Sequence, residues 1–135
     1  MGGTAPVVAV LNSNDDVVEL LRLMLEQAGL VVVSAHVDAV KRGDVSLVDF
    51  VNEHQPDVVI YDVVPPYDRS WRFLEHLRQT TLRHRRFVIT STNPKRAAEL
   101  AGTSEDIYEI VGKPYDIDRI VEATRHAAKA RPTRD

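Results

Sequence analysis

Short apolar runs alternate with amphipathic stretches along almost the whole chain, and this alternation constrains the fold more than any other feature. The apolar runs are rich in valine and isoleucine, whereas the stretches between them repeat apolar residues at helical spacing. The runs predict strands at residues 7–11, 30–35, 57–61, 87–89 and 107–111. The intervening stretches predict helices at residues 17–28, 44–54, 71–78, 95–101 and 116–129.

This order of strand then helix predicts an α/β fold of the doubly wound, flavodoxin-like class. Parallel strands need crossover connections, and right-handed helical crossovers cover both faces of the sheet. We expect a five-stranded parallel sheet between two helix layers, which is a three-layer (βα)5 architecture. The 135 residues suit one domain, with a core at about residues 6–129, a tail at 131–135 and no output domain.

Composition narrows the class of protein. The net charge of −3 gives no reason to expect a nucleic-acid partner, and we expect the basic cluster at residues 83–86 in a solvated loop. The chain has no cysteine, which suits a reducing compartment. Its apolar runs are far shorter than the ~20 residues that a membrane span needs. These features predict a cytoplasmic protein with neither a nucleic-acid nor a membrane partner.

Asp62 is the residue that most strongly indicates function, because it follows the apolar run at residues 58–61 directly. Open α/β sheets hold their reactive groups at the carboxyl ends of the strands, which converge on one crevice. Polar residues follow other predicted strands as well, and we expect them near Asp62: Asn12, Ser13, Thr90, Ser91 and Lys113.

A carboxylate, hydroxyl groups and an ammonium group at one site suit phosphoryl transfer to the carboxylate, since the donors can bind phosphoryl oxygens as charge develops. Asp62 as a plain loop or capping acid is the structural alternative. No glycine-rich phosphate loop follows the first strand, which argues against a nucleotide-binding enzyme on this scaffold.

Two stretches carry a resemblance to a known family: residues 56–66, PDVVIYDVVPP, and residues 112–115, GKPY. Together they resemble the receiver domain of two-component response regulators. The resemblance implies that Asp62 is the phosphoacceptor, that Lys113 is its salt-bridging partner and that a cis peptide bond precedes Pro114. It also implies a switch hydroxyl at the end of the fourth strand, which is either Thr90 or Ser91.

The sequence departs from the family where receivers bind magnesium. Asn12 and Ser13 stand where the family has an acidic pair, so the metal ligands implied by the resemblance are Asp62, the backbone carbonyl of Val64, Ser13 and Asn12. We expect magnesium affinity to be weakened or lost, because neutral ligands replace carboxylates. Asp15 and Asp16 could substitute through a shifted loop, but acids also favour helix starts on capping and dipole grounds.

The aromatic residue of the family switch is also displaced. Receivers usually carry it three positions before the lysine, where this chain has Ile110, whereas Tyr108 lies five positions before Lys113. Both positions point to one face of a strand, since strand side chains alternate with a period of two. The usual coupling between the hydroxyl and an aromatic side chain is therefore in question.

The resemblance implies a stand-alone receiver that takes a phosphoryl group from a histidine kinase or a phosphotransfer protein. It would then change the surface formed by residues 95–101, 107–111 and 116–129, and so signal to a separate downstream protein or form a homodimer there. Its only expected turnover is autophosphorylation and autodephosphorylation at Asp62. The alternative is a phosphorylation-independent pseudo-receiver that acts as a docking or dimerisation module.

Overall fold

The computed structural model describes residues 5–104, 106–112 and 116–129. Five parallel strands form one sheet in the order β2-β1-β3-β4-β5, which confirms the doubly wound α/β fold. Each strand has six residues: β1 (Val7–Asn12), β2 (Val31–His36), β3 (Val58–Val63), β4 (Arg86–Ser91) and β5 (Ile107–Gly112).

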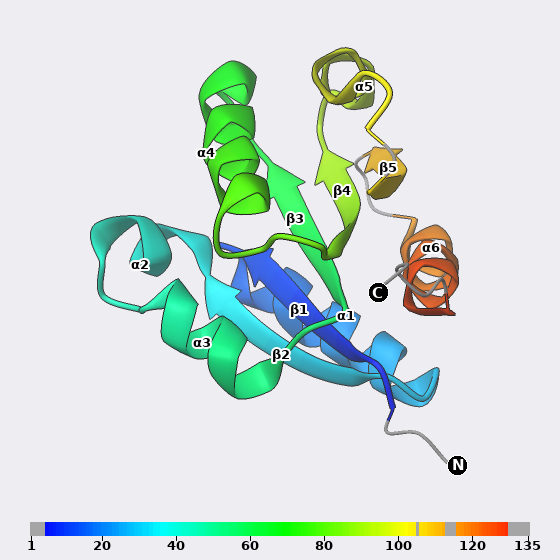
Figure 1. The fold of residues 1–135 in the computed structure, drawn as a ribbon. Coiled ribbons are helices and arrows are strands. Elements are labelled where there is room, and N and C mark those ends of the chain that lie inside the picture. The colour runs from blue at the N-terminus through cyan, green and yellow to red at the C-terminus, as the bar shows by residue number, and fades with distance from the viewer. Residues whose placement is uncertain (1–4, 105, 113–115, 130–135) are drawn as a thin grey trace.

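Six helices formed by the described residues cover the two faces of the sheet (Figure 1). They are α1 (Asp15–Gln27), α2 (Val37–Arg42), α3 (Leu47–His54), α4 (Tyr67–Gln79), α5 (Pro94–Ala101) and α6 (Ile117–Lys129). Buried residues of α1 and α6 form one core with the sheet, and those of α2 to α5 form the other. The expected three layers are therefore present.

Side-chain alternation divides the strands between these two cores. In β3, Val58 and Ile60 belong to the core beneath α1 and α6, whereas Val59, Tyr61 and Val63 belong to the opposite core. All six side chains of β3 are buried, as expected for a central parallel strand with both faces covered. A polar side chain in this strand can reach solvent only at its end.

The region between β2 and β3 differs from the prediction of one helix at residues 44–54. Two helices are present, because α2 follows β2 directly and ends at Gly43, whose φ of 83° is in the left-handed region. The next helix begins at Leu47, since the hydroxyl of Ser46 accepts the backbone N–H of Asp49. In α3, Val51 is buried, whereas Val48 is 54% exposed.

Two further boundaries differ from the prediction. The third strand was expected to end at residue 61 but runs on through Val63, so Asp62 lies inside the strand. The helix expected at residues 71–78 begins four residues earlier, at Tyr67.

The predicted solvated loop at residues 83–86 is also only partly correct. Arg83 and His84 are exposed, but Arg86 is the first residue of β4 and is buried. The strand therefore begins inside the basic cluster. Among the helices of the described residues, none is both long and apolar enough to cross a membrane.

Two leucines of α1 test the assignment of its buried face. Leu25 is completely buried, whereas Leu23 is 55% exposed. We expect Leu25→Ala to lower the free energy of unfolding by about 2–5 kcal/mol, because it removes packed methyl groups and leaves a cavity. Leu23→Ala should change it by less than about 0.5 kcal/mol. Urea denaturation measures both, and equal losses would contradict the assignment.

Candidate functional site

The candidate site lies where the central strands end. In the β3–β4 pair, Asp62 lies opposite Thr90 and Val63 lies opposite Ser91. Asp62 is 8% exposed, so its carboxylate is largely removed from water. Burial of a carboxylate is costly unless partners satisfy its oxygens, so the groups around Asp62 determine what it can do.

Thr90 supplies one such partner. Its hydroxyl Oγ1 donates a hydrogen bond to Oδ1 of Asp62 at 2.5 Å, the short distance typical of a hydroxyl bonded to a charged acceptor. Ser91 is equally buried, but its Oγ accepts the backbone N–H of Asn93 at 3.0 Å. Successive strand residues point to opposite faces. Of the two expected hydroxyls, the structure therefore brings Thr90 to Asp62 and directs Ser91 elsewhere.

Asn12 and Ser13 approach Asp62 from β1. Asn12 is buried, and its Oδ1 accepts the backbone N–H of Asn14 at 2.8 Å, which shapes the turn into α1. Asn14 is the N-cap of α1, and its side chain accepts the backbone N–H groups of Asp16 and Val17. Asp16 is exposed in the first helical turn. The acids after β1 thus take part in a helix start, as their capping interpretation predicts.

Lys113 and Pro114 lie outside the described residues. The residue before them, Gly112, pairs with Ser91 at the end of β5. The side chain of Tyr108 is also outside the described part of the chain. Ile110, at the expected aromatic position, packs against the core of α2 to α5.

A cavity of about 140 Å³ opens beside Asp62. This volume is several times the minimum needed for one water molecule, so it has room for a phosphoryl group. Nine residues from β1, α2, β3 and the start of α4 line it: Asn12, Ser13, Val37, Asp38, Lys41, Tyr61, Asp62, Val64 and Ser70. The expected residues Asn12, Ser13, Asp62 and Val64 therefore come together around one space.

Four polar residues of the cavity were not anticipated from the sequence. Asp38 and Lys41 come from α2, the helix that the sequence analysis missed, and both are exposed. Tyr61 and Ser70 come from β3 and α4 and are buried. The signal that could have found the first two is a charged pair three residues apart, one helical turn, directly after a strand.

Tyr61 is a buried member of the cavity lining. The side chain is 1% exposed, and its hydroxyl has no hydrogen-bond partner among the described residues. Ser70 lies beside it, but Oγ of Ser70 accepts the backbone N–H of Val64 at 3.2 Å. Burial raises the pKa of Tyr61 to about 12, so the phenol remains a neutral donor.

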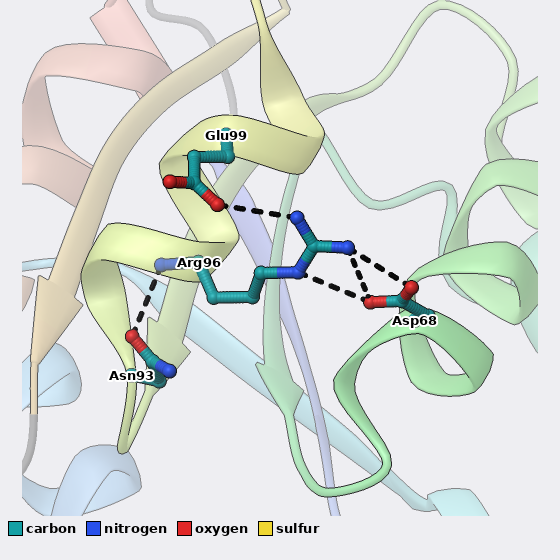
Figure 2. A network of polar contacts seen from close by, with 4 residues as sticks. All are labelled: Asp68, Asn93, Arg96 and Glu99. Carbon is teal, nitrogen blue, oxygen red and sulfur yellow. Dashed lines mark hydrogen bonds and ion pairs between the residues drawn. The ribbon is translucent and has the colours of Figure 1, made fainter.

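Two contacts join the start of α4 to the segment that follows β4. The hydroxyls of Tyr67 and Thr92 are hydrogen-bonded at 2.5 Å. Beside them, Arg96 of α5 donates through Nε and Nη2 to the carboxylate of Asp68 on α4, at 2.8–3.1 Å, and also binds Glu99 (Figure 2). These ion pairs raise the pKa of Arg96. The helix starts that follow Asp62 and Thr90 are therefore linked directly.

A divalent cation in the cavity would meet a mixed set of oxygens. The carboxylates that line it are those of Asp62 and Asp38, and nowhere in the described chain do three or more acidic, histidine or cysteine side chains gather. Oδ1 of Asn12 is already bonded to a backbone N–H, and Oδ1 of Asp62 to Thr90. Magnesium prefers carboxylate and water oxygens in near-octahedral geometry. This donor set does not fit a site built on adjacent acids.

Sequence comparison identifies the family to which this arrangement belongs. Residues 8–125 match the family model of the response regulator receiver domain. The chain belongs to this family. The resemblance noted in the sequence is thereby confirmed. Receiver domains exchange phosphoryl groups with histidine kinases or phosphotransfer proteins, act on downstream effectors and generally bind magnesium at an acidic site.

Solved receiver structures share the fold. The N-terminal signal receiver domain of a two-component system response regulator from Bacteroides fragilis is 20% identical, with a TM-score of 0.71 over 94% of this chain and 99% of that chain. A response regulator from Thermotoga maritima is 16% identical, with a TM-score of 0.72 over 93% and 99%. No curated protein gives a significant sequence match. At these identities the structural likeness establishes the fold alone.

The raised pKa of Tyr61 predicts a loss of stability at high pH. Above the ordinary tyrosine pKa of 10.0, the unfolded chain releases this proton first, so unfolding becomes easier as pH rises toward about 12. The free energy of unfolding should fall by up to about 1.4 kcal/mol per pH unit more steeply in the native chain than in Tyr61→Phe. Urea denaturation at several pH values measures this difference, and parallel pH profiles would contradict it.

Proposed function

We propose that this receiver accepts a phosphoryl group on Asp62 from a histidine kinase or a phosphotransfer protein and passes the signal to a separate downstream protein. The observation that carries the proposal is the buried Asp62 carboxylate at a cavity, with the Thr90 hydroxyl donating to its Oδ1. An acid in a solvated loop would need neither a buried position nor a hydroxyl donor beside it. The surroundings of Asp62 instead suit a carboxylate whose negative charge increases when it is phosphorylated.

The chemical step is a displacement at phosphorus. A carboxylate oxygen of Asp62 forms a bond to phosphorus while the bond from phosphorus to the donor breaks, and the donor's leaving atom keeps the electron pair. The product is an acyl phosphate on Asp62. Thr90 is the hydroxyl that then moves to a phosphoryl oxygen, because it already lies within hydrogen-bond distance of the acceptor carboxylate.

The change in charge at Asp62 provides the switch. A phosphoryl group brings about −1.5 to −2 charge at neutral pH, so it attracts the Thr90 hydroxyl and shifts the population of β4 conformations. Ser91 follows Thr90 and holds the backbone of Asn93, whose side chain caps α5. The displacement thus reaches α5, and the proposed output surface consists of α5, β5 and α6.

Magnesium affinity is low in this proposal. Asn12 and Ser13 replace the family's acidic pair at the end of β1, and neither brings negative charge to the cavity. If magnesium binds, Asp62, the Val64 carbonyl, Asn12 and Ser13 are the residues that would hold it, and the cation would neutralise phosphoryl oxygens. The chain's own contribution is to bury Asp62 and to place Thr90 beside it.

Replacement of the phosphoacceptor tests the proposed function. Incubation of the folded chain with a small-molecule phosphodonor should add the mass of one phosphoryl group, and Asp62→Asn should abolish this gain because the amide is a poor nucleophile. Asp68→Asn is the matched control, since Asp68 is an exposed acid on α4. It should be modified like the native chain. Intact mass spectrometry measures all three.

The proposal would be wrong if the native chain remained folded but was not modified by any phosphodonor. The same result would favour a phosphorylation-independent pseudo-receiver, in which Asp62→Asn leaves partner binding unchanged. Equal mass gain in the native chain and in Asp62→Asn would place the modification on another residue.

Restoration of the acids tests the assignment of the metal site. Asn12→Asp keeps an Oδ1 that can accept the Asn14 N–H, and Ser13→Asp adds a second carboxylate at the cavity. We expect the double variant to bind magnesium at least about tenfold more tightly than the native chain, because hard cations favour carboxylate ligands. A metal titration followed by tryptophan fluorescence or calorimetry measures the gain, and unchanged affinity would show that these side chains do not face the cation.

A further inference from the structure

Lys41 is the feature of the cavity that the family assignment does not explain. It lies near the end of α2 and lines the same cavity as the Asp62 carboxylate. Among the described lining residues it is the one that carries positive charge; the other charged residues there are Asp38 and Asp62. A cation at this position bears directly on any chemistry that adds negative charge to Asp62.

Phosphorylation of Asp62 would change the balance of charge in the cavity. Conversion of Asp62 to an acyl phosphate replaces one negative charge by about −1.5 to −2, at a position where the acid is 8% exposed. Partial burial strengthens electrostatic interactions, so the added charge is costly unless a positive group approaches it. Asn12 and Ser13 offer no anionic site to recruit a metal ion for this purpose.

A contact with Phe73 keeps the Lys41 side chain on this side of the molecule. The ammonium Nζ lies 5.2 Å from the centre of the Phe73 ring, within cation–π distance. Phe73 follows Ser70 by three residues on α4, so the two side chains project from the same face of that helix. Ser70 lines the cavity. The ammonium therefore has a contact next to the cavity wall, although the residue as a whole is exposed.

Tyr61, a buried residue of the cavity lining, is a second observation that bears on what the cavity binds. Its hydroxyl is buried and unpartnered among the described residues, and its raised pKa keeps the proton in place. A buried donor without an acceptor carries a free-energy cost that a bound oxyanion would relieve. Lys41 and Tyr61 are both donors, and they reach the cavity from different elements.

We propose that the Lys41 ammonium takes the place of the divalent cation in this receiver, binding the phosphoryl oxygens at Asp62 so that phosphorylation proceeds without magnesium. This inference rests on the proposed function, because it concerns the same acceptor. Tyr61 adds a neutral hydrogen bond to the bound group. Asp38, on the same helix as Lys41, is an exposed acid that lines the same cavity.

The experiment compares phosphorylation rates in magnesium-free buffer and with added magnesium, using a small-molecule phosphodonor and intact mass. The native chain should react at rates within about threefold of each other under the two conditions. Lys41→Gln should lower the magnesium-free rate at least about tenfold, as loss of a charge-stabilising donor does in other sites. Lys41→Arg, which keeps the charge, should recover most of the rate. Lys129→Gln, an exposed lysine at the end of α6, is the control.

Three results would overturn the inference, and they are distinguishable. A native rate that collapses without magnesium and does not respond to Lys41→Gln would return the role to a metal ion. If Asp38→Asn, rather than Lys41→Gln, lowers the phosphorylation rate in the presence of magnesium, Asp38 would be one of the ligands of that metal. An absence of modification in all variants and conditions would remove the proposed function itself. Lys41 is exposed, so its variants should remain folded, which their urea denaturation curves check.

Discussion

A sheet of parallel strands with both faces covered leaves polar side chains almost no place except the strand ends. In β3 all six positions are buried, and five of them are apolar residues or the Tyr61 ring. Asp62 is tolerated there because it lies one residue from the end of the strand, opposite Thr90 on β4. The contact of the Thr90 hydroxyl with Asp62 depends on this register, and so does the place of Asp62 at the cavity. A shift by one residue would place Asp62 in the opposite core.

The sequence was sufficient for the architecture but insufficient for the inner detail of the site. Strong apolar runs predicted all five strands, because burial on both faces requires continuous hydrophobicity. Helix α2 was missed because it has six residues and no side-chain cap at His36, so tertiary burial of Val37 stabilises it rather than local propensity. The choice between Thr90 and Ser91 depends on which face each occupies, and only the strand register determines that.

The missed helix is also the one that changes the chemistry expected of the site. From the sequence, Asn12 and Ser13 in place of the family's acidic pair were expected to weaken magnesium binding at the end of β1. The structure shows that α2 brings Asp38 and Lys41 to the cavity that Asp62 lines, so this cavity holds charged groups that the sequence analysis did not anticipate. The buried Tyr61, which precedes Asp62 in β3, lines the same cavity. Electrostatic complementarity can be retained when its source moves from a bound ion to a side chain.

The link between the starts of α4 and α5 has two parts of different physical character. The Tyr67–Thr92 bond joins neutral hydroxyls, whereas the Asp68–Arg96 contact joins exposed charges (Figure 2). Mobile ions screen exposed charges over about 8 Å at physiological ionic strength, but they affect a neutral hydrogen bond little. Dissolved salt therefore loosens one half of the link and leaves the other intact. The stiffness of the connection between the starts of α4 and α5 consequently varies with the ionic composition of the surrounding solution.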